Sequence, residues 1–163
     1  MAFPFVPKAT VEVPDIPYAS SVQFPAAESA LIVVDMQEWD IWPRHCAKDS
    51  WGWQIIDELQ PRADDLVCQK NRYDGFYGTS MEHFLSHIWK ISYLVLIGTV
   101  SNICVLHTAA SAGLRWYHIV LPADGISALT EFDQALTLRQ VTALYAGRVV
   151  KEMTDIAFTR SQN

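Results

Sequence analysis

The sequence lacks both the long apolar runs of a membrane protein and the basic clusters of a nucleic-acid-binding protein. Its longest strongly apolar runs, Leu31 to Val34 and Leu94 to Ile97, have the length of strands. A membrane-spanning helix needs roughly 20 such residues. The 12 Lys and Arg are outnumbered by 18 Asp and Glu, which gives a formal net charge of −6. We therefore expect neither a membrane nor a nucleic acid as a partner.

Cysteine and charge are also scarce. Three cysteines, an odd number, argue against a disulfide scaffold and for a reducing compartment. The first charge is Lys8, and prolines interrupt the segment around it, so no signal-peptide core is expected and a cytoplasmic location is predicted. Only 18% of the 163 residues are charged and 50% are hydrophobic, a composition that suits a single compact domain.

Proline is concentrated at the N-terminus, where five of the eight prolines fall within residues 1–25. Proline removes backbone donors and favours extended backbone. We predict an arm over residues 1–29 that lies on its own domain or on a neighbouring subunit, followed by a single domain over residues 30–163.

Short apolar runs alternate with helical stretches beyond the arm. The runs typical of strands buried on both faces are Ala30–Met36, Asp65–Gln69, Tyr93–Gly98, His118–Pro122 and Arg148–Lys151. The helical stretches are Ser50–Leu59, Ser80–Lys90, Asn102–Leu114 and Phe132–Ala146, and Asn102 is a candidate cap of its helix. This alternation predicts an α/β, three-layer α/β/α Rossmann-like fold with a parallel sheet covered by helices on both faces.

Chemically useful side chains follow three of the predicted strands. Asp35 follows the first strand, Lys70 the second, and Cys104 lies shortly after the third. Ligands of parallel α/β sheets bind outside the carboxyl ends of the strands, so these three residues are candidates for a site. Each also has an ordinary interpretation, as a turn aspartate, a solvated lysine and a buried cysteine.

The position of Cys104 makes the combination more specific. It falls in the first turn of a helix that directly follows a buried strand. Free backbone N–H groups and the helix dipole stabilise a thiolate there, and a nearby lysine cation stabilises it further. The same N–H groups can form an oxyanion hole, and Asp35 can take the thiol proton and deliver it to a leaving amine.

These residues lie in segments that resemble a known family. LIVVDMQ with Asp35, KNRYDGFYGT with Lys70 and IGTVSNICVLHTAASAGL with Cys104 resemble the Asp, Lys and Cys triad segments of the isochorismatase-like cysteine hydrolases, which include the nicotinamidases. The resemblance covers roughly Ala30 to Ile156. It implies that Cys104 attacks a carbonyl carbon, Asp35 shuttles the proton and Lys70 holds the charges. The implied reaction cleaves an amide or related C–N bond of a small molecule through a thioester, with no cofactor.

The resemblance also implies features of the backbone and of assembly. A non-proline cis peptide is expected between Val100 and Ser101, aiming the N–H groups of Val100 and Cys104 at the oxyanion. Family members are commonly oligomers, so a homo-oligomer is expected. The residues that either supply its interface or pack on the sheet are Leu138, Val141, Leu144 and Tyr145.

The chain departs from the family after Asp35. Only six residues separate Asp35 from Trp42, where the next similar segment, WPRHC, begins. The family usually has a helix, a further strand and a metal-ligand or substrate-contact loop there. Residues 37–64 suffice for one parallel crossover but not two, so we expect five strands where the family has six. His45 is then a weak metal candidate without partners, and no metal is predicted.

Aromatic residues gather after the strands that carry Asp35 and Lys70. They either wall a small pocket for a compact amide or fill space left by the missing segment; they are Trp39, Trp42, Tyr73, Phe76 and Tyr77. Two further functions stay open beside the amide hydrolase. One is a weak or inactive family member that acts as a binding module, and the other is hydrolysis of a vinyl ether, which need not use a cysteine.

Overall fold

The computed structural model describes residues 15–34, 49–51, 54, 55, 57 and 60–160. Four predicted site residues, Asp35, Trp39, Trp42 and His45, lie outside these ranges. The first half of the predicted arm lies outside them as well. Its later part is included and contains strand β1 (Val22–Pro25).

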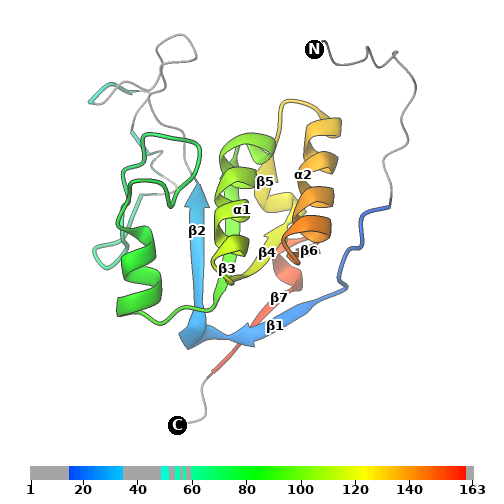
Figure 1. Cartoon of the computed structure of the whole chain (residues 1–163), viewed down its shortest axis with the longest axis horizontal. Helices are drawn as coiled ribbons and strands as arrows, with labels where there is room; N and C mark the ends of the chain where they lie inside the picture. The colour runs from blue at the N-terminus through cyan, green and yellow to red at the C-terminus, as the bar shows by residue number, and fades with distance from the viewer. Residues whose placement is uncertain (1–14, 35–48, 52–53, 56, 58–59, 161–163) are drawn as a thin grey trace, which may run out of the picture.

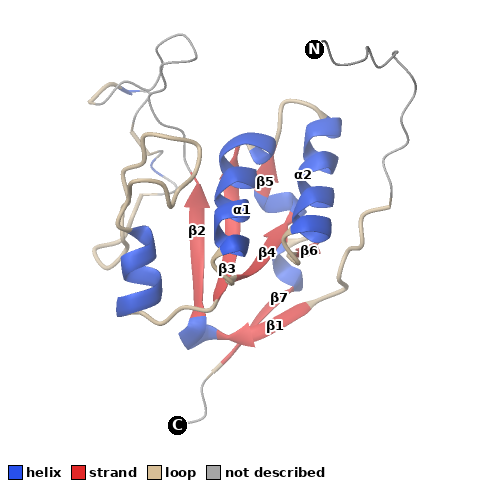
Figure 2. Cartoon of the chain, in the orientation of Figure 1, coloured by secondary structure: helices blue, strands red, loops and turns tan. Residues whose placement is uncertain are grey.

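A parallel sheet forms the centre of the molecule (Figures 1 and 2). Four strands lie in the order β2-β3-β4-β6, and the short strand β5 pairs with the end of β3. All these pairings are parallel. The bounds are Ser29–Val34 for β2, Tyr93–Thr99 for β3, His118–Pro122 for β4, Ile126–Ser127 for β5 and Arg148–Val150 for β6. The predicted α/β class with a parallel sheet is confirmed.

The helical segments follow the predicted order. The π-helical turn η5 and helix α1 together cover the predicted helix Asn102–Leu114, and α2 matches the predicted helix Phe132–Ala146 within two residues at each end. The bounds are His83–Ile88 for η4, Ser101–Val105 for η5, Leu106–Leu114 for α1 and Glu131–Leu144 for α2, with single 3-10 turns at Ala26–Glu28, Ala123–Gly125 and Met153–Asp155. The predicted helix Ser50–Leu59 lies partly outside the described residues. None of the described helices is long and apolar enough to cross a bilayer.

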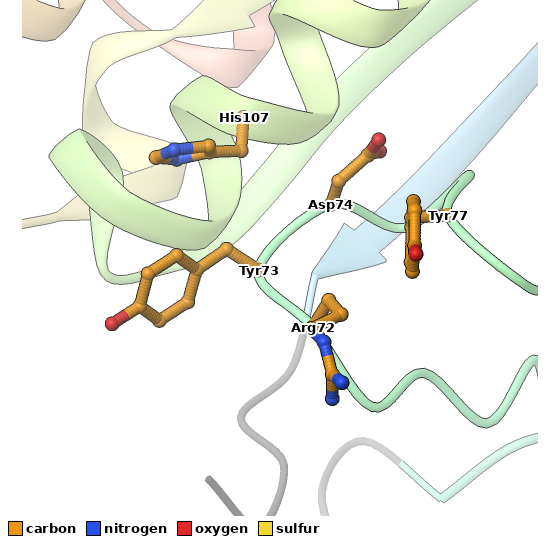
Figure 3. Close-up of a pocket in the computed structure, with 5 residues that line it drawn as sticks. All are labelled: Arg72, Tyr73, Asp74, Tyr77 and His107. Carbon is orange, nitrogen blue, oxygen red and sulfur yellow. The ribbon is translucent and has the colours of Figure 1, made fainter. Parts of the chain in front are cut away.

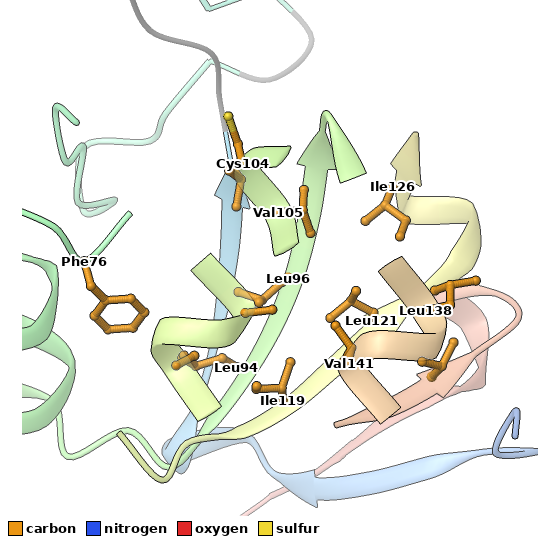
Figure 4. Close-up of a cluster of buried hydrophobic side chains, with 14 of the residues drawn as sticks. Phe76, Leu94, Leu96, Cys104, Val105, Ile119, Leu121, Ile126, Leu138 and Val141 are labelled. Atoms are coloured by element: carbon orange, nitrogen blue, oxygen red, sulfur yellow. The ribbon is translucent and has the colours of Figure 1, made fainter. Parts of the chain in front are cut away.

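Helices α1 and α2 cover one face of the sheet, and the main core lies beneath them (Figures 1 and 4). Side chains alternate between the two faces of a strand, so Leu94 and Leu96 of β3 face these helices while Val95 faces the other side. Leu138 and Val141 of α2 are fully buried in this core. Their role is therefore packing on the sheet, whereas Leu144 is exposed.

The opposite face is covered by a two-stranded parallel ladder of β1 and β7 (Ile156–Thr159). Phe24 of β1 stacks on Tyr93 with ring centroids 5.2 Å apart, which ties the ladder to the sheet. The cover does not extend to β2, where Leu31 and Val33 are 55% and 49% exposed. The prediction that this strand is buried on both faces is therefore wrong.

One predicted strand is absent. Residues 66–70 form no strand, and exposed and less exposed side chains alternate along them. The apolar run Asp65–Gln69 was therefore wrongly predicted as a strand, because such a run does not by itself show a pairing partner. Within the described residues the sheet has five strands, the expected number, because the short strand β5 pairs with the end of β3.

Candidate active site

Cys104 lies at the carboxyl end of the sheet, as the sequence predicts. Strand β3 ends at Thr99, Val100 makes the connection, and η5 begins at Ser101 with Cys104 as its fourth residue. The cysteine is 6% exposed, and Figure 4 shows its sulfur at the end of the core beside β2. A free thiol thus sits in the first helical turn after a buried strand, where exposed backbone N–H groups favour an anion.

Gly98 brings the ends of β2 and β3 together at this point. It pairs with Val34 and has a φ of 121°, a backbone conformation that residues other than glycine rarely adopt. A Cβ at this position would lie 2.1 Å from the carbonyl oxygen of Val34. The residue after Val34 is Asp35, so the backbone leading to the predicted proton shuttle contacts the backbone leading to Cys104.

Lys70 reaches Cys104 from the neighbouring segment. Its side chain is buried, at 6% exposed, and its Nζ lies 3.7 Å from the Sγ of Cys104. The same ammonium donates a hydrogen bond to the carbonyl oxygen of Arg72 at 3.2 Å. A buried ammonium is costly unless it is paired, and a thiolate at Cys104 would pair it. The structure thus brings together two of the three predicted triad residues.

The cis peptide is present but lies one residue earlier than predicted. It joins Thr99 to Val100, not Val100 to Ser101. The connection between β3 and η5 is the single residue Val100, because the strand continues to Thr99 and the helical turn begins at Ser101. The Val100 carbonyl accepts hydrogen bonds from the N–H groups of Ile103 and Val105 at 3.1 and 3.3 Å. The oxyanion role of the Val100 and Cys104 N–H groups stays a prediction.

Helix α2 supports the turn that carries Cys104, a contact that the sequence did not reveal. Thr137 donates to Ser101 Oγ at 3.4 Å, and both side chains are fully buried. Asn102 donates to Asp133 at 3.0 Å, so it joins η5 to α2. The prediction that Asn102 caps its own helix is wrong, because Val100 holds the cap position of η5 and makes no side-chain hydrogen bond there.

A shallow cavity of about 260 Å³ lies beside the Lys70 segment and the helix of Cys104 (Figure 3). Tyr73 and Tyr77 line it, as expected of pocket-wall residues, together with Arg72, Asp74 and His107. His107 was not identified as a wall residue from the sequence, although it lies three positions after Cys104. Its ring lies 5.3 Å from that of Tyr73. The cavity therefore offers flat aromatic surfaces, and neither Lys70 nor Cys104 is among the residues that line it.

Phe76 does not line this cavity, contrary to the prediction. It is 4% exposed and belongs to the main core, where its ring lies 5.8 Å from that of Tyr117. The guanidinium of Arg115 covers it at 4.9 Å from the ring centroid. Full burial of the ring in the apolar core removes more apolar surface from water than a place in a shallow, open cavity would.

Metal ligation finds no support in the part of the chain that the structure describes. Among these residues, no three His, Cys, Asp or Glu side chains come together in a way that could hold an ion. His45, the weak metal candidate, lies outside the described residues.

Comparison with known proteins extends the resemblance noted in the sequence. A family model described as the isochorismatase domain matches residues 39–153. The match includes Lys70 and Cys104 and begins after Asp35. Over 100 residues the chain is 33% identical to the ureidoacrylate amidohydrolase RutB of Serratia proteamaculans, an alignment that covers 61% of this chain and 40% of that protein. The chain spans 40% to 46% of the length of the curated relatives it matches.

Solved structures of similar proteins include amidases with a similar fold. The N-carbamoylsarcosine amidase of Thermoplasma acidophilum is 35% identical with a TM-score of 0.64, covering 75% of this chain and 71% of that one. The nicotinamidase/pyrazinamidase PncA of Bacillus subtilis has a TM-score of 0.66 over 74% of each chain. At 24% identity this second likeness concerns the fold alone.

Proposed function

Because this chain belongs to the isochorismatase family, we propose that it is a cysteine hydrolase that cleaves an amide or related C–N bond of a small molecule. The observation that carries the proposal is the buried pair of Lys70 Nζ and Cys104 Sγ, 3.7 Å apart, at the start of η5. A thiolate held by a helix N-terminus and an ammonium is a competent nucleophile.

The proposed reaction has two steps. Cys104 attacks the carbonyl carbon, the C–N bond breaks, and the nitrogen leaves with the proton that Asp35 took from the thiol. Water then gives a proton to Asp35 and attacks the thioester, the C–S bond breaks to release the acid, and Asp35 returns its proton to the sulfur. The backbone N–H groups of Val100 and Cys104 stabilise the oxyanion in both steps, and Lys70 stabilises the thiolate and the carboxylate.

The substrate class follows from the cavity and the relatives. Tyr73, Tyr77 and His107 provide flat walls for a compact, planar group, and Arg72 provides a cation at the rim. Similar proteins are named for ureidoacrylate and N-carbamoylsarcosine, both small molecules with an amide-type C–N bond. We therefore choose ureidoacrylate and N-carbamoylsarcosine as the first test compounds.

The proposal includes a homo-oligomer in the cytoplasm. Cys68 and Cys104 are both free thiols, which suits a reducing compartment. Leu144, at the end of α2, is 66% exposed and is therefore the interface candidate that the sheet does not cover. Light scattering of the purified chain gives the oligomeric state directly, and a mass equal to the 18.4 kDa monomer would contradict this part.

The decisive experiment measures the alkylation rate of each cysteine by iodoacetamide at pH 6, resolved by peptide mass spectrometry. Cys68 is the internal control because it is more exposed than Cys104, so faster labelling of Cys104 must reflect reactivity and not access. Turnover of the two test compounds follows, with Cys104→Ala inactive and Asp35→Asn nearly so. Labelling of Cys104 at the rate of Cys68, with no turnover, would favour the binding-module alternative.

A further inference from the structure

Lys70 lies in a segment that belongs to no strand of the sheet. Residues 66–70 are not assigned to any strand, yet Lys70 is buried and its Nζ lies beside Cys104. A long, flexible lysine side chain holds a precise position only where the backbone that carries it is fixed. The residues that fix this backbone therefore determine whether the ammonium meets the sulfur.

The anchor lies four and five residues beyond Lys70, at Asp74 and Gly75. Ser111 Oγ donates to Asp74 Oδ2 at 2.5 Å, and the N–H of Phe76 donates to Asp74 Oδ1 at 2.8 Å. The N–H of Gly75 donates to Thr108 Oγ1 at 3.0 Å. Hydrogen bonds to a carboxylate are stronger than those between neutral groups, so Asp74 makes the strongest of these connections.

Gly75 approaches its neighbours closely. A Cβ there would lie 3.0 Å from Met81 Cε and 3.3 Å from Thr108 Cγ2, tighter than ordinary contact. Thr108 itself is fully buried, so its hydroxyl is committed to this contact. The Lys70 segment is thus held firmly against α1.

The helix that receives the anchor also carries the nucleophile. Cys104, Thr108 and Ser111 are separated by four and three residues, so they follow one another along one side of the η5–α1 helix, one and two turns apart. The segment meets this side at three points: Lys70 at Cys104, Gly75 at Thr108 and Asp74 at Ser111. The spacing between ammonium and sulfur is therefore set by contacts within one helix and one loop.

We propose that Asp74 is a positioning residue for the proposed reaction: by joining Ser111 to the Phe76 N–H it holds Lys70 against Cys104. The proposal rests on the proposed function of Cys104 as nucleophile. Asp74 lines the cavity, but its carboxylate points away from the Arg72 guanidinium in Figure 3 and both of its oxygens are already engaged. Its role is accordingly to act through Lys70 and not to bind the substrate.

The test compares the alkylation rate of Cys104 at pH 6 in Asp74→Ala, Ser111→Ala and Asp74→Asn. Asp74→Ala removes the connection to Ser111 and should slow labelling by about ten-fold, because the ammonium of Lys70 is then no longer held at the sulfur. Ser111→Ala should act in the same direction and is the milder substitution if the first variant folds poorly. Asp74→Asn keeps an acceptor for the Phe76 N–H and a partner for the Ser111 hydroxyl, so it should restore most of the rate.

Two controls separate positioning from general stability. Asp155→Ala removes a comparable carboxylate, which accepts from the Glu152 N–H at 3.1 Å in the turn before β7, and should leave Cys104 labelling unchanged. In a Lys70→Met background, Asp74→Ala should have no further effect, because the lysine it positions is gone. With substrate, Asp74→Ala should lower kcat far more than it raises KM.

The outcomes distinguish the inference from the proposed function. A fast Cys104 in the parent with an unchanged rate in Asp74→Ala overturns the positioning role and leaves the hydrolase standing. A full Asp74→Ala effect in the Lys70→Met background also overturns it, since the effect then does not pass through Lys70. A parent Cys104 that labels no faster than Cys68 overturns both.

Discussion

Lys70 Nζ lies 3.7 Å from Cys104 Sγ, and both side chains are only 6% exposed. The two residues are 34 positions apart in the chain and come from different elements, so the fold must assemble the pair. An ammonium is costly to bury unless it is paired, and in the proposed reaction Lys70 also stabilises the thiolate of Cys104. The pair therefore links the proposed reactivity to stability.

Replacing Lys70 by Met should lower the reactivity of Cys104 without unfolding the protein. Met keeps an apolar stem of similar length, so the fold should persist, while alkylation of Cys104 at pH 6 and turnover should fall by about two orders of magnitude. Lys151→Met at an exposed position is the matched control and should change neither rate. Equal labelling in parent and Lys70→Met would show that the ammonium does not activate the sulfur.

The sequence alone was sufficient to place Cys104 at the carboxyl end of the sheet, because it follows the buried strand β3. Lys70 lies beside it as expected, but it follows no strand and reaches the sulfur from a loop. The sequence was not sufficient for the segment before Lys70. Val67 sits in an apolar run that suggests a strand, yet it is 57% exposed, since an apolar run does not specify a partner.

Side-chain hydrogen bonds between distant elements were the least predictable feature. Asn102 looks like a helix cap in the sequence but joins Asp133 of α2 instead. No local pattern singles out Asp74, and only the packing of its loop on α1 reveals the bond to Ser111. Local patterns report on neighbours in the chain, whereas these contacts depend on which helices the sheet places side by side.

Gly98→Ala should prevent the assembly of the site. Its φ of 121° is rare for alanine, and the new Cβ would lie 2.1 Å from the Val34 carbonyl oxygen, so β2 and β3 would have to separate. We expect a loss of more than about 4 kcal/mol, measured by urea unfolding. Gly78→Ala is the control: its φ is 66°, nothing lies within 4 Å of a Cβ there, and about 1 kcal/mol should be lost. Similar losses in the two variants would contradict the close approach of the strands.

Thr130 is expected to contribute measurably to the stability of α2. Its Oγ1 accepts from the Asp133 N–H at 3.2 Å and donates to the Asp133 carboxylate at 2.7 Å, the arrangement of a helix N-cap. Thr130→Ala should lower the free energy of unfolding by about 1 kcal/mol, and Thr130→Ser should retain most of it. Asp133 also accepts from Asn102, so the alanine variant should accelerate hydrogen exchange in η5 as well as in the first turn of α2. Faster hydrogen exchange in α2 alone would show that loss of the cap does not affect the turn that carries Cys104.

Tyr117 should make the protein sensitive to alkaline pH. Burial raises the pKa of Tyr117 above its ordinary value of 10.0, and the negative charge of Glu82 raises this pKa further, while Ser86 and Arg115 act in the opposite direction. The folded state therefore keeps the phenol protonated at a pH where the unfolded chain begins to ionise. This contribution to stability is complete below pH 10 and is lost as the pH rises through the pKa of the folded state.

Tyr117→Phe should remove that dependence. The variant lacks the ionisable group. Its free energy of unfolding should therefore increase relative to that of the parent as the pH rises from 9 to 11. Urea unfolding at one-unit pH intervals measures this difference. Tyr77→Phe, which removes a phenol that is 65% exposed, is the control. If the difference in free energy of unfolding between Tyr117→Phe and the parent stays constant over this range, the phenol ionises equally readily in the folded and unfolded chains. That result would contradict an effect of burying Tyr117 beside Phe76.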